Sequence, residues 1–144
     1  MEAKFNDRLK EIMDERGVTP KQLSQATGIS LTSVYSWRKG ESYKIYLSNL
    51  IKLCDALECS LEFLIGRTET PLDYKPQPCP PFYDRLRGVM EKEGITRYRL
   101  VQKTKIYDNY FTVWKRGRDP QLYSLIELAD YIGCTLDYLV GRDR

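Results

Sequence analysis

The sequence predicts an all-α protein made of two similar five-helix units that a proline-rich segment joins. Three observations indicate this fold: apolar residues recur at helical spacing, the chain repeats itself, and prolines gather between the two repeats. No segment shows a convincing strand pattern, so helices account for the expected fold. The first helix ends at Gly17, and its apolar stripe consists of Phe5, Leu9, Ile12 and Met13.

The second helix of the first unit is indicated by its start and stop signals. Thr19 is the expected N-cap, and Pro20 stands at the first helical position, where its missing N–H does no harm. Leu23 and Ala26 are expected to face inward, and Gly28 ends this short helix. A tight turn is therefore expected before the next helix.

Three more helices complete the first unit. Ser30 is expected to cap the third helix, which carries Val34 and Trp37 and ends at Gly40. A long fourth helix follows, and Ser60 is expected to cap a short fifth. The apolar residues of these last two helices are Leu47, Leu50, Ile51, Leu53, Cys54, Leu57, Leu61, Phe63, Leu64 and Ile65.

The second unit repeats this plan. A shift of 77 positions places Phe5, Leu9, Gly17, Thr19, Leu23, Thr27, Ile29, Trp37 and Gly40 on identical residues, from Phe82 to Gly117. After a loop that is two residues shorter, a shift of 75 pairs Leu47 through Arg67 with Leu122 through Arg142. The predicted boundaries are residues 1–67 for the first domain, 68–81 for the linker and 82–144 for the second domain. The linker contains Pro71, Pro76, Pro78, Pro80 and Pro81, which indicate an extended spacer.

Composition argues against several classes of protein. Histidine is absent, and neither a Gly-rich phosphate loop nor a nucleophile–base spacing occurs, so no enzyme, metal site, cofactor or small-molecule ligand is expected. The cysteines form no CxxC pair, and Cys54 and Cys59 fall in an apolar pattern that predicts buried thiols. No apolar run is long enough to cross a membrane, and the first residues lack a signal-peptide pattern, so a cytoplasmic protein is expected.

Positive charge is concentrated in the second unit. The formal net charge is only +3, and residues 1–70 carry ten basic and ten acidic residues. Residues 94–118, in contrast, carry seven basic residues and one acidic residue, whereas residues 17–41 carry three and one. Such a local cluster attracts phosphate, although an ordinary solvated surface is an equally good interpretation.

Residues 20–37 have the pattern of a helix-turn-helix. Two short helices joined by a tight glycine-containing turn can present the second helix to the major groove of DNA. Gly28 can adopt the left-handed turn conformation, and Ser24 is small where the two helices cross. Ile29, Val34 and Trp37 are expected to pack inward and to fix the angle between the helices.

The run TPKQLSQATGISLTSVYSWRKGE, followed by LSNLIKLCDALECSLEFLIG, resembles the Cro and phage-repressor (xenobiotic-response-element, lambda-repressor-like) helix-turn-helix family. The run VWKRGRDPQLYSLIELADYIGCTLDYLVG of the second unit is similar to the same family. The resemblance implies two tandem five-helix lambda-repressor-like domains, with the third helix of each in the major groove of double-stranded DNA. It also implies transcriptional regulation, most often repression.

The resemblance assigns roles in the first unit position by position. The candidate base readers on its third helix are Leu31, Thr32, Ser33, Tyr35 and Ser36. Ser30 would cap that helix and also bond a phosphate. The other phosphate candidates, which position the protein without reading sequence, are Lys21, Gln22, Arg38 and Lys39.

The corresponding base-reading set in the second unit is Asp108, Asn109, Tyr110, Thr112 and Val113. Asn109 could pair with adenine, whereas Asp108 would either repel phosphate or accept a hydrogen bond from cytosine. The phosphate candidates from the basic cluster are Arg97, Arg99, Lys115 and Arg116. Tyr35 and Tyr110 could equally be packing aromatics. The repeated pairs Asp7 with Arg8 and Asp84 with Arg85 are expected to be surface ion pairs.

The two copies differ where helix-turn-helix geometry is strictest. Lys105 replaces the turn glycine, Val101 the small residue and Tyr107 the capping serine. A left-handed Lys105 and a lost cap are each expected to cost about 1 kcal/mol. Shape therefore favours the first copy as base reader, and charge favours the second as phosphate anchor.

Two classes of function remain open. In the first, the chain is a covalent pseudo-dimer that binds an asymmetric operator with both copies, and a homodimer is also possible. In the second, one or both copies dock a protein partner instead of DNA, as an interaction module or an anti-repressor.

Overall fold

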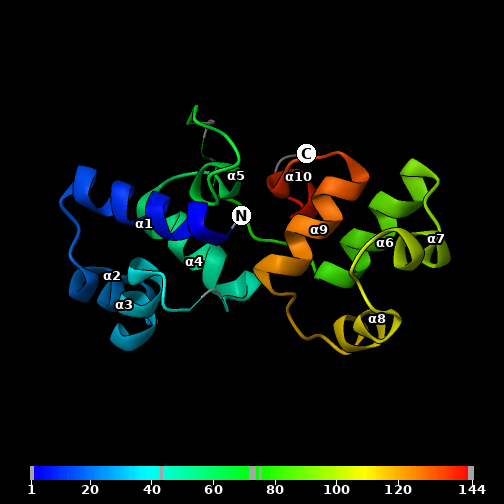
Figure 1. The fold of residues 1–144 in the computed structure, drawn as a ribbon, viewed down its shortest axis with the longest axis horizontal. Coiled ribbons are helices and arrows are strands. Elements are labelled where there is room, and N and C mark those ends of the chain that lie inside the picture. The colour runs from blue at the N-terminus through cyan, green and yellow to red at the C-terminus, as the bar shows by residue number, and fades with distance from the viewer. Residues whose placement is uncertain (1, 43, 72–73, 75, 143–144) are drawn as a thin grey trace. The chain divides into compact units, whose positions relative to one another are not determined.

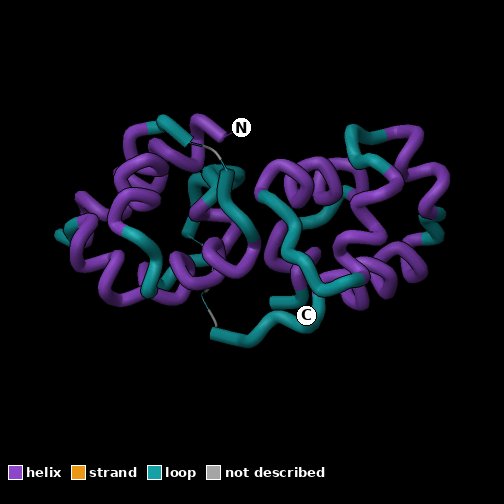
Figure 2. Tube along the Cα trace, turned by 90° about the horizontal axis from the view of Figure 1, so that it is seen from below, coloured by secondary structure: helices purple, strands orange, loops and turns teal. Residues whose placement is uncertain are grey.

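A computed structural model of the chain describes residues 2–42, 44–71, 74 and 76–142, with side chains from residue 5 onward. The described residues form helices and loops without a strand, which confirms the predicted all-α class (Figures 1 and 2). The structure divides into two compact units, unit 1 (Met1–Lys75) and unit 2 (Pro76–Arg144). No helix in the described ranges is both long and apolar enough to span a membrane.

Unit 1 contains five helices among its described residues, and their caps follow the predicted signals. They are α1 (Glu2–Arg16), α2 (Pro20–Thr27), α3 (Leu31–Lys39), α4 (Leu47–Leu57) and α5 (Leu61–Leu64). Thr19, Ser30 and Ser60 each accept a hydrogen bond from a backbone N–H in the first turn of the helix that they precede. These bonds satisfy amides that a helix start otherwise leaves without a partner.

The core of unit 1 forms where α1 packs on α3 and α5 and where α4 packs on α2 and α5. The α1 stripe of Phe5, Leu9, Ile12 and Met13 is fully buried, as predicted. Each such side chain contributes roughly 1.5–3 kcal/mol when it leaves water. The prediction that Ala26 faces inward is wrong, because Leu23 is the buried residue of α2 and Ala26 is exposed. The methyl group of Ala26 has too little apolar area to decide which face of α2 is buried.

Unit 2 also contains five helices among its described residues. They are α6 (Phe82–Glu93), α7 (Arg97–Lys103), α8 (Asp108–Lys115), α9 (Leu122–Ile132) and α10 (Leu136–Val140). Helix α6 packs on α8 and α10, and α9 packs on α10. Trp114 lies at the centre of an aromatic cluster, with its ring 5.2 Å from that of Phe82 and 5.5 Å from that of Phe111.

An arginine on the first helix of each unit ties that helix to the last. The Arg8 Nη1 donates to the carbonyl oxygen of Phe63 at 2.7 Å, and its guanidinium lies 4.1 Å from the Phe63 ring centroid. Arg85 makes the equivalent contact, because its Nη2 donates to the carbonyl oxygen of Tyr138 at 2.6 Å and its guanidinium lies 4.7 Å from that ring. The same tie therefore occurs in both units.

This tie corrects the prediction of surface ion pairs for the repeated arginines. Arg8 is only 5% exposed, and its ion-pair partners are Glu69 and Glu11. Its place beside Leu9 puts it at the edge of the buried α1 stripe. From there a guanidinium can satisfy the carbonyl groups of a short helix end while its flat face covers an aromatic ring.

Both ends of the predicted 68–81 spacer are fastened to a unit. In unit 1 the carbonyl oxygen of Thr68 accepts from Arg8 at 3.0 Å, and the Tyr74 hydroxyl donates to Asp55 at 2.8 Å. In unit 2 a Cβ built on Gly141 would lie 2.8 Å from the Pro80 ring, so Pro80 packs directly on that glycine. Positions 72, 73 and 75 of the predicted spacer lie outside the described residues.

Candidate nucleic-acid interface

Hydroxyl groups fix the turn between α2 and α3 of unit 1. Gly28 takes the left-handed conformation with φ of 77°. The Ser24 hydroxyl donates to the carbonyl oxygen of Ile29 at 2.5 Å, which explains why a small polar residue stands there. The Thr27 hydroxyl donates to the Leu23 carbonyl oxygen at 2.7 Å and accepts from the Ile29 N–H at 3.2 Å. Sequence reasoning overlooked Thr27, although the repeat marks it by the identical Thr104.

The turn of unit 2 is built differently, and the predicted strain at Lys105 does not occur. Helix α7 ends at Lys103, and Thr104 follows in an extended conformation with φ of −129°. Lys105 keeps a negative φ, because Glu58 is the one non-glycine residue with positive φ in the described part of the chain. Thr104 repeats the bonds of its counterpart, donating to the Leu100 carbonyl oxygen and accepting from the Ile106 N–H. An earlier helix end thus replaces the left-handed turn.

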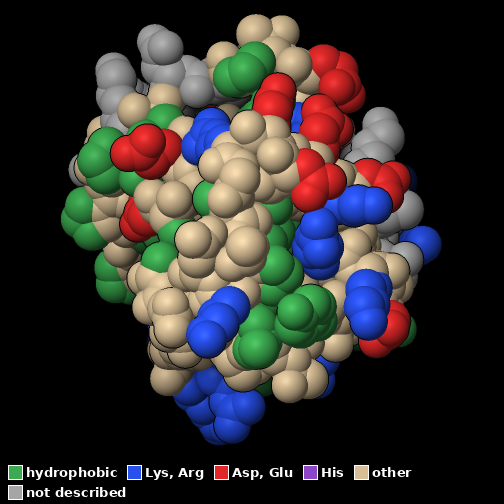
Figure 3. Space-filling model, turned by 90° about the vertical axis from the view of Figure 1, so that its left-hand side faces the viewer, with side chains coloured by type: hydrophobic (Ala, Val, Ile, Leu, Met, Phe, Trp, Pro, Cys, Tyr) green, Lys and Arg blue, Asp and Glu red, His purple; other side chains and the backbone are tan. Residues whose placement is uncertain are grey.

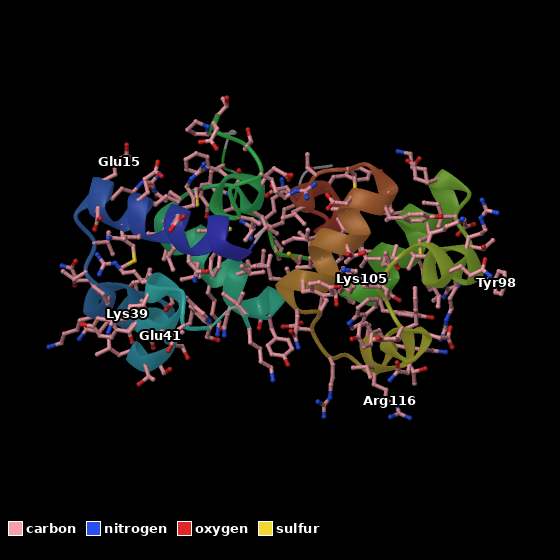
Figure 4. The ribbon with its side chains drawn as sticks, in the orientation of Figure 1. Glu15, Lys39, Glu41, Tyr98, Lys105 and Arg116 are labelled. Carbon is pink, nitrogen blue, oxygen red and sulfur yellow. The ribbon has the colours of Figure 1, made fainter. Side chains whose placement is uncertain are left out.

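The second helix of each motif presents the same positions to solvent. In α3 the exposed residues are Leu31, Thr32, Tyr35 and Lys39, while Val34 and Trp37 are buried. In α8 the exposed residues are Asp108, Asn109, Thr112 and Lys115, while Phe111 and Trp114 are buried, and the exposed Arg116 follows directly after the helix. Lys39 is the last residue of α3, and Figure 4 shows Arg116, just beyond the end of α8, at the edge of unit 2.

Some of the predicted base readers lie beside this exposed face rather than on it. Ser33 and Ser36 are half-buried, and the Ser30 hydroxyl donates to that of Ser33 at 2.8 Å. Tyr110 is also half-buried, with its ring 5.6 Å from Tyr107 and 5.9 Å from the core Trp114. Val113 of α8 is likewise half-buried.

Some phosphate candidates of unit 1 already have hydrogen-bond or ion-pair partners within the unit. Lys21 is exposed, and so is Gln22, although its Oε1 accepts from the Thr19 N–H in a capping box. Arg38 donates to Asp14 of α1 at 3.0 Å, so its charge is partly compensated. On the face of unit 1 in Figure 3, Lys and Arg side chains lie mainly in the lower half, and most Asp and Glu side chains lie above them.

The basic cluster of unit 2 is more open, with one exception. Arg99, Lys115 and Arg116 are exposed. Arg97 instead forms an ion pair with Asp108 at the start of α8, with 2.8 Å between its Nε and the carboxylate. No residue described in unit 2 takes the place of the capping Ser30, because Tyr107 makes no side-chain bond to the helix start.

Sequence reasoning did not single out Tyr98, which is 71% exposed on α7 and projects outward in Figure 4. It occupies the position that Lys21 holds in unit 1. Tyr107, expected only to replace a cap, is 68% exposed. The repeat alignment could have marked both, because each is an aromatic residue where the first copy has a polar one.

Unit 1 is similar to a known family of domains. Residues 8–69 match the Cro/C1-type HTH DNA-binding domain. This range begins within α1 and ends shortly after α5, so the similarity covers the five helices of unit 1. The match confirms the resemblance seen in the first copy, and it ends before unit 2.

Two curated relatives are regulators of transcription. The chain is 37% identical over 67 residues to the cryptic phage CTXphi transcriptional repressor RstR of Vibrio cholerae serotype O1. This alignment covers 46% of the chain and 59% of the relative. It is 31% identical over 61 residues to the HTH-type transcriptional regulator ImmR of Bacillus subtilis. This second alignment covers 42% of the chain and 48% of the relative. The matched part thus spans about half the length of these relatives. No solved structure matches the chain.

Proposed function

We propose that the chain is a sequence-specific DNA-binding transcriptional regulator, a repressor, that places α3 of unit 1 in the major groove. The carrying observation is the Cro/C1-type HTH domain at residues 8–69, whose α3 presents Leu31, Thr32 and Tyr35 to solvent. Leu31 can contact a thymine methyl group, and the Thr32 hydroxyl can reach several base edges. Lys21, Lys39 and the Gln22 amide would hold the phosphates on either side.

Unit 2 is proposed to bind the same DNA as a second, non-identical reading head. Asp108, Asn109 and Thr112 of α8 are exposed like their counterparts on α3, which supports a common mode of approach. Arg99, Lys115 and Arg116 supply exposed positive charge for phosphate binding. Because the exposed residues of α3 and α8 differ, the operator would consist of two unlike half-sites, and the chain would act as a covalent pseudo-dimer.

The test is selection of binding sites from a random duplex library with the full chain, followed by titrations over a range of salt concentrations. Thr32→Ala with Tyr35→Ala should relax sequence preference in one half-site by about tenfold. Lys115→Gln with Arg116→Gln should weaken binding to all sequences and reduce the salt slope by about 2. Lys52→Gln, which removes an exposed charge on α4, is the matched control. A library that yields no enriched sequence would refute the proposal.

A protein partner for unit 2 is the second candidate function. The exposed rings of Tyr98 and Tyr107 favour it, because exposed aromatic residues are typical of protein-docking surfaces. The same titrations distinguish the two functions. If unit 2 docks a protein, Lys115→Gln with Arg116→Gln leaves the salt slope of DNA binding unchanged, and only one half-site is enriched.

A further inference from the structure

The contact between Arg97 and Asp108 is a feature of unit 2 that phosphate anchoring does not explain. The Arg97 Nε donates to the Asp108 carboxylate and its Nη2 donates to the Asp108 backbone carbonyl, both at 2.8 Å. The guanidinium carbon lies 4.7 Å from the centroid of the Phe111 ring, which is buried in the core. Arg97 is thus held from two sides, and it fixes the carboxylate in turn.

The same three positions form no such cluster in unit 1. There they are occupied by Pro20, Leu31 and Val34. The exposed position of the recognition helix therefore changes from an apolar Leu31 to an acidic Asp108. The two positions that support it change to a cation and to a ring on which the cation stacks. The three substitutions together form one cluster, in which Arg97 bonds Asp108 and stacks on Phe111.

A carboxylate on the DNA-facing side of such a helix is unfavourable unless its charge is compensated, because it approaches phosphates. Arg97 supplies that compensation. The pair is also accessible, because the Asp108 side chain is 71% exposed and that of Arg97 is 43% exposed. A carboxylate carries about four acceptor sites, so it keeps accepting capacity after bonding one guanidinium N–H.

We infer that Asp108 reads a cytosine in the half-site of unit 2 and that Arg97 is its positioning residue. This inference rests on the proposed binding of unit 2 to DNA. The carboxylate accepts from the cytosine N4 amine, which is the major-groove donor of a C·G pair. Thymine O4 and guanine O6 are acceptors, so they face the carboxylate with repulsion. The half-site of unit 2 therefore prefers cytosine at this position, then adenine, and disfavours thymine and guanine.

The first test pairs a change in the protein with a change in one base. Full-length wild type and Asp108→Ala are titrated with the selected duplex and with one in which 2-pyrimidinone, which lacks the N4 amine, replaces the cytosine. The wild type should lose about tenfold in affinity on this replacement, and Asp108→Ala should lose much less. Asp84→Asn, which removes an exposed charge on α6, should behave as the wild type. Equal losses in wild type and Asp108→Ala would overturn the role of Asp108.

The second test separates positioning by Arg97 from direct phosphate binding. Arg97→Gln should weaken binding to every duplex by about tenfold, because it leaves the Asp108 charge uncompensated. Adding Asp108→Asn should restore this general affinity without restoring the preference for cytosine. If Arg97→Gln is equally damaging in the Asp108→Asn background, Arg97 is a phosphate contact and the positioning role is wrong.

The outcomes also separate this inference from the proposed function. If the wild type selects a second half-site that depends on Lys115 and Arg116 but shows no base preference governed by Asp108, only the inference fails. If no second half-site is selected at all, the binding of unit 2 to DNA and the reading by Asp108 both fail. Circular dichroism of each variant establishes that the helices are retained.

Discussion

The α2–α3 segment of unit 1 and the α7–α8 segment of unit 2 expose nearly the same positions but are built by different local chemistry. Unit 1 has a left-handed Gly28 after α2 and a capping Ser30 before α3. In unit 2, α7 ends one position earlier than α2 does, and the Tyr107 side chain does not cap α8. In both, the buried residues of the second helix are the fourth and seventh. The difference teaches that core packing orients this helix and that the turn only has to be compatible with it.

The units also differ in how their positive charges are used. In unit 1, Arg38 is paired with Asp14, and Lys39 lies 5.8 Å from the Tyr35 ring centroid. In unit 2, Arg97 is paired while Arg116 and its basic neighbours are exposed. A count of charges along the sequence therefore understates the contrast, because pairing within a unit lowers the field that reaches phosphate.

The largest expected effect tests whether the two units fold separately. Trp114→Ala should destabilise unit 2 by about 3–5 kcal/mol, because it removes the centre of the aromatic cluster. A domain of this size has little more stability than that. Calorimetry should then show loss of one transition while that of unit 1 persists, and Trp37→Ala should give the converse. If both transitions shift together in either variant, the units are not independent.

The next effect concerns the arginine tie between the first and last helix of each unit. Arg8→Met keeps much of the stem but leaves the Phe63 and Thr68 carbonyl groups without this donor. It should cost about 2–3 kcal/mol in denaturant titrations. Arg85→Met should cost less, since Arg85 is only half-buried. An equal or larger effect at Arg85 would contradict this ranking.

The starts of α3 and α8 give a smaller effect of opposite sign. Ser30→Ala removes the bond to the Ser33 N–H and should destabilise unit 1 by about 1 kcal/mol. Tyr107→Ser introduces the missing cap and should stabilise unit 2 by a similar amount, because Tyr107 already has the extended backbone of an N-cap. Thermal unfolding of the two variants measures both. A loss of stability in Tyr107→Ser would mean that its ring contact with Tyr110 outweighs a cap.

The smallest expected effect is that of Glu58→Gly at the end of α4, and Gly133→Ala at the end of α9 is its counterpart in unit 2. Glu58 ends α4 with φ of 50°, where unit 2 has Gly133 with φ of 82°. Glu58→Gly should therefore stabilise unit 1 by about 0.5 kcal/mol. Gly133→Ala should destabilise unit 2 by about 1 kcal/mol, purely through its backbone, because nothing lies within 4 Å of the added Cβ. Thermal unfolding measures both variants, and stability changes of the same sign would show that the two helix ends do not favour glycine for the same reason.

Local signals predicted most of the helical plan. The caps at Thr19, Ser30 and Ser60 and the α1 stripe were all confirmed, because capping and helical period depend on residues three or four apart. The turn of unit 2 was not predicted. Replacing Gly28 by Lys105 suggested a strained copy, but the chain avoided the strain by ending α7 early, which a position-by-position comparison cannot show.

The sequence predicted which residues lie on α3 but not which of their side chains are exposed. Leu31, Thr32 and Tyr35 were placed on the exposed face, while Ser33 and Ser36 turned out half-buried. The reason is geometric, because a helix of eight or nine residues exposes only one stripe once two of its residues enter the core.

The sequence by itself determined the helices, their caps and the apolar stripes, since each follows from residues close together in the chain. Only the tertiary structure decided what the long cationic side chains do. Arg8 reaches a carbonyl 55 positions away, Arg38 a carboxylate 24 away and Arg97 one 11 away. A guanidinium at the end of a flexible stem takes whichever partner the packed helices bring near it, and that partner is fixed only when the helices have packed.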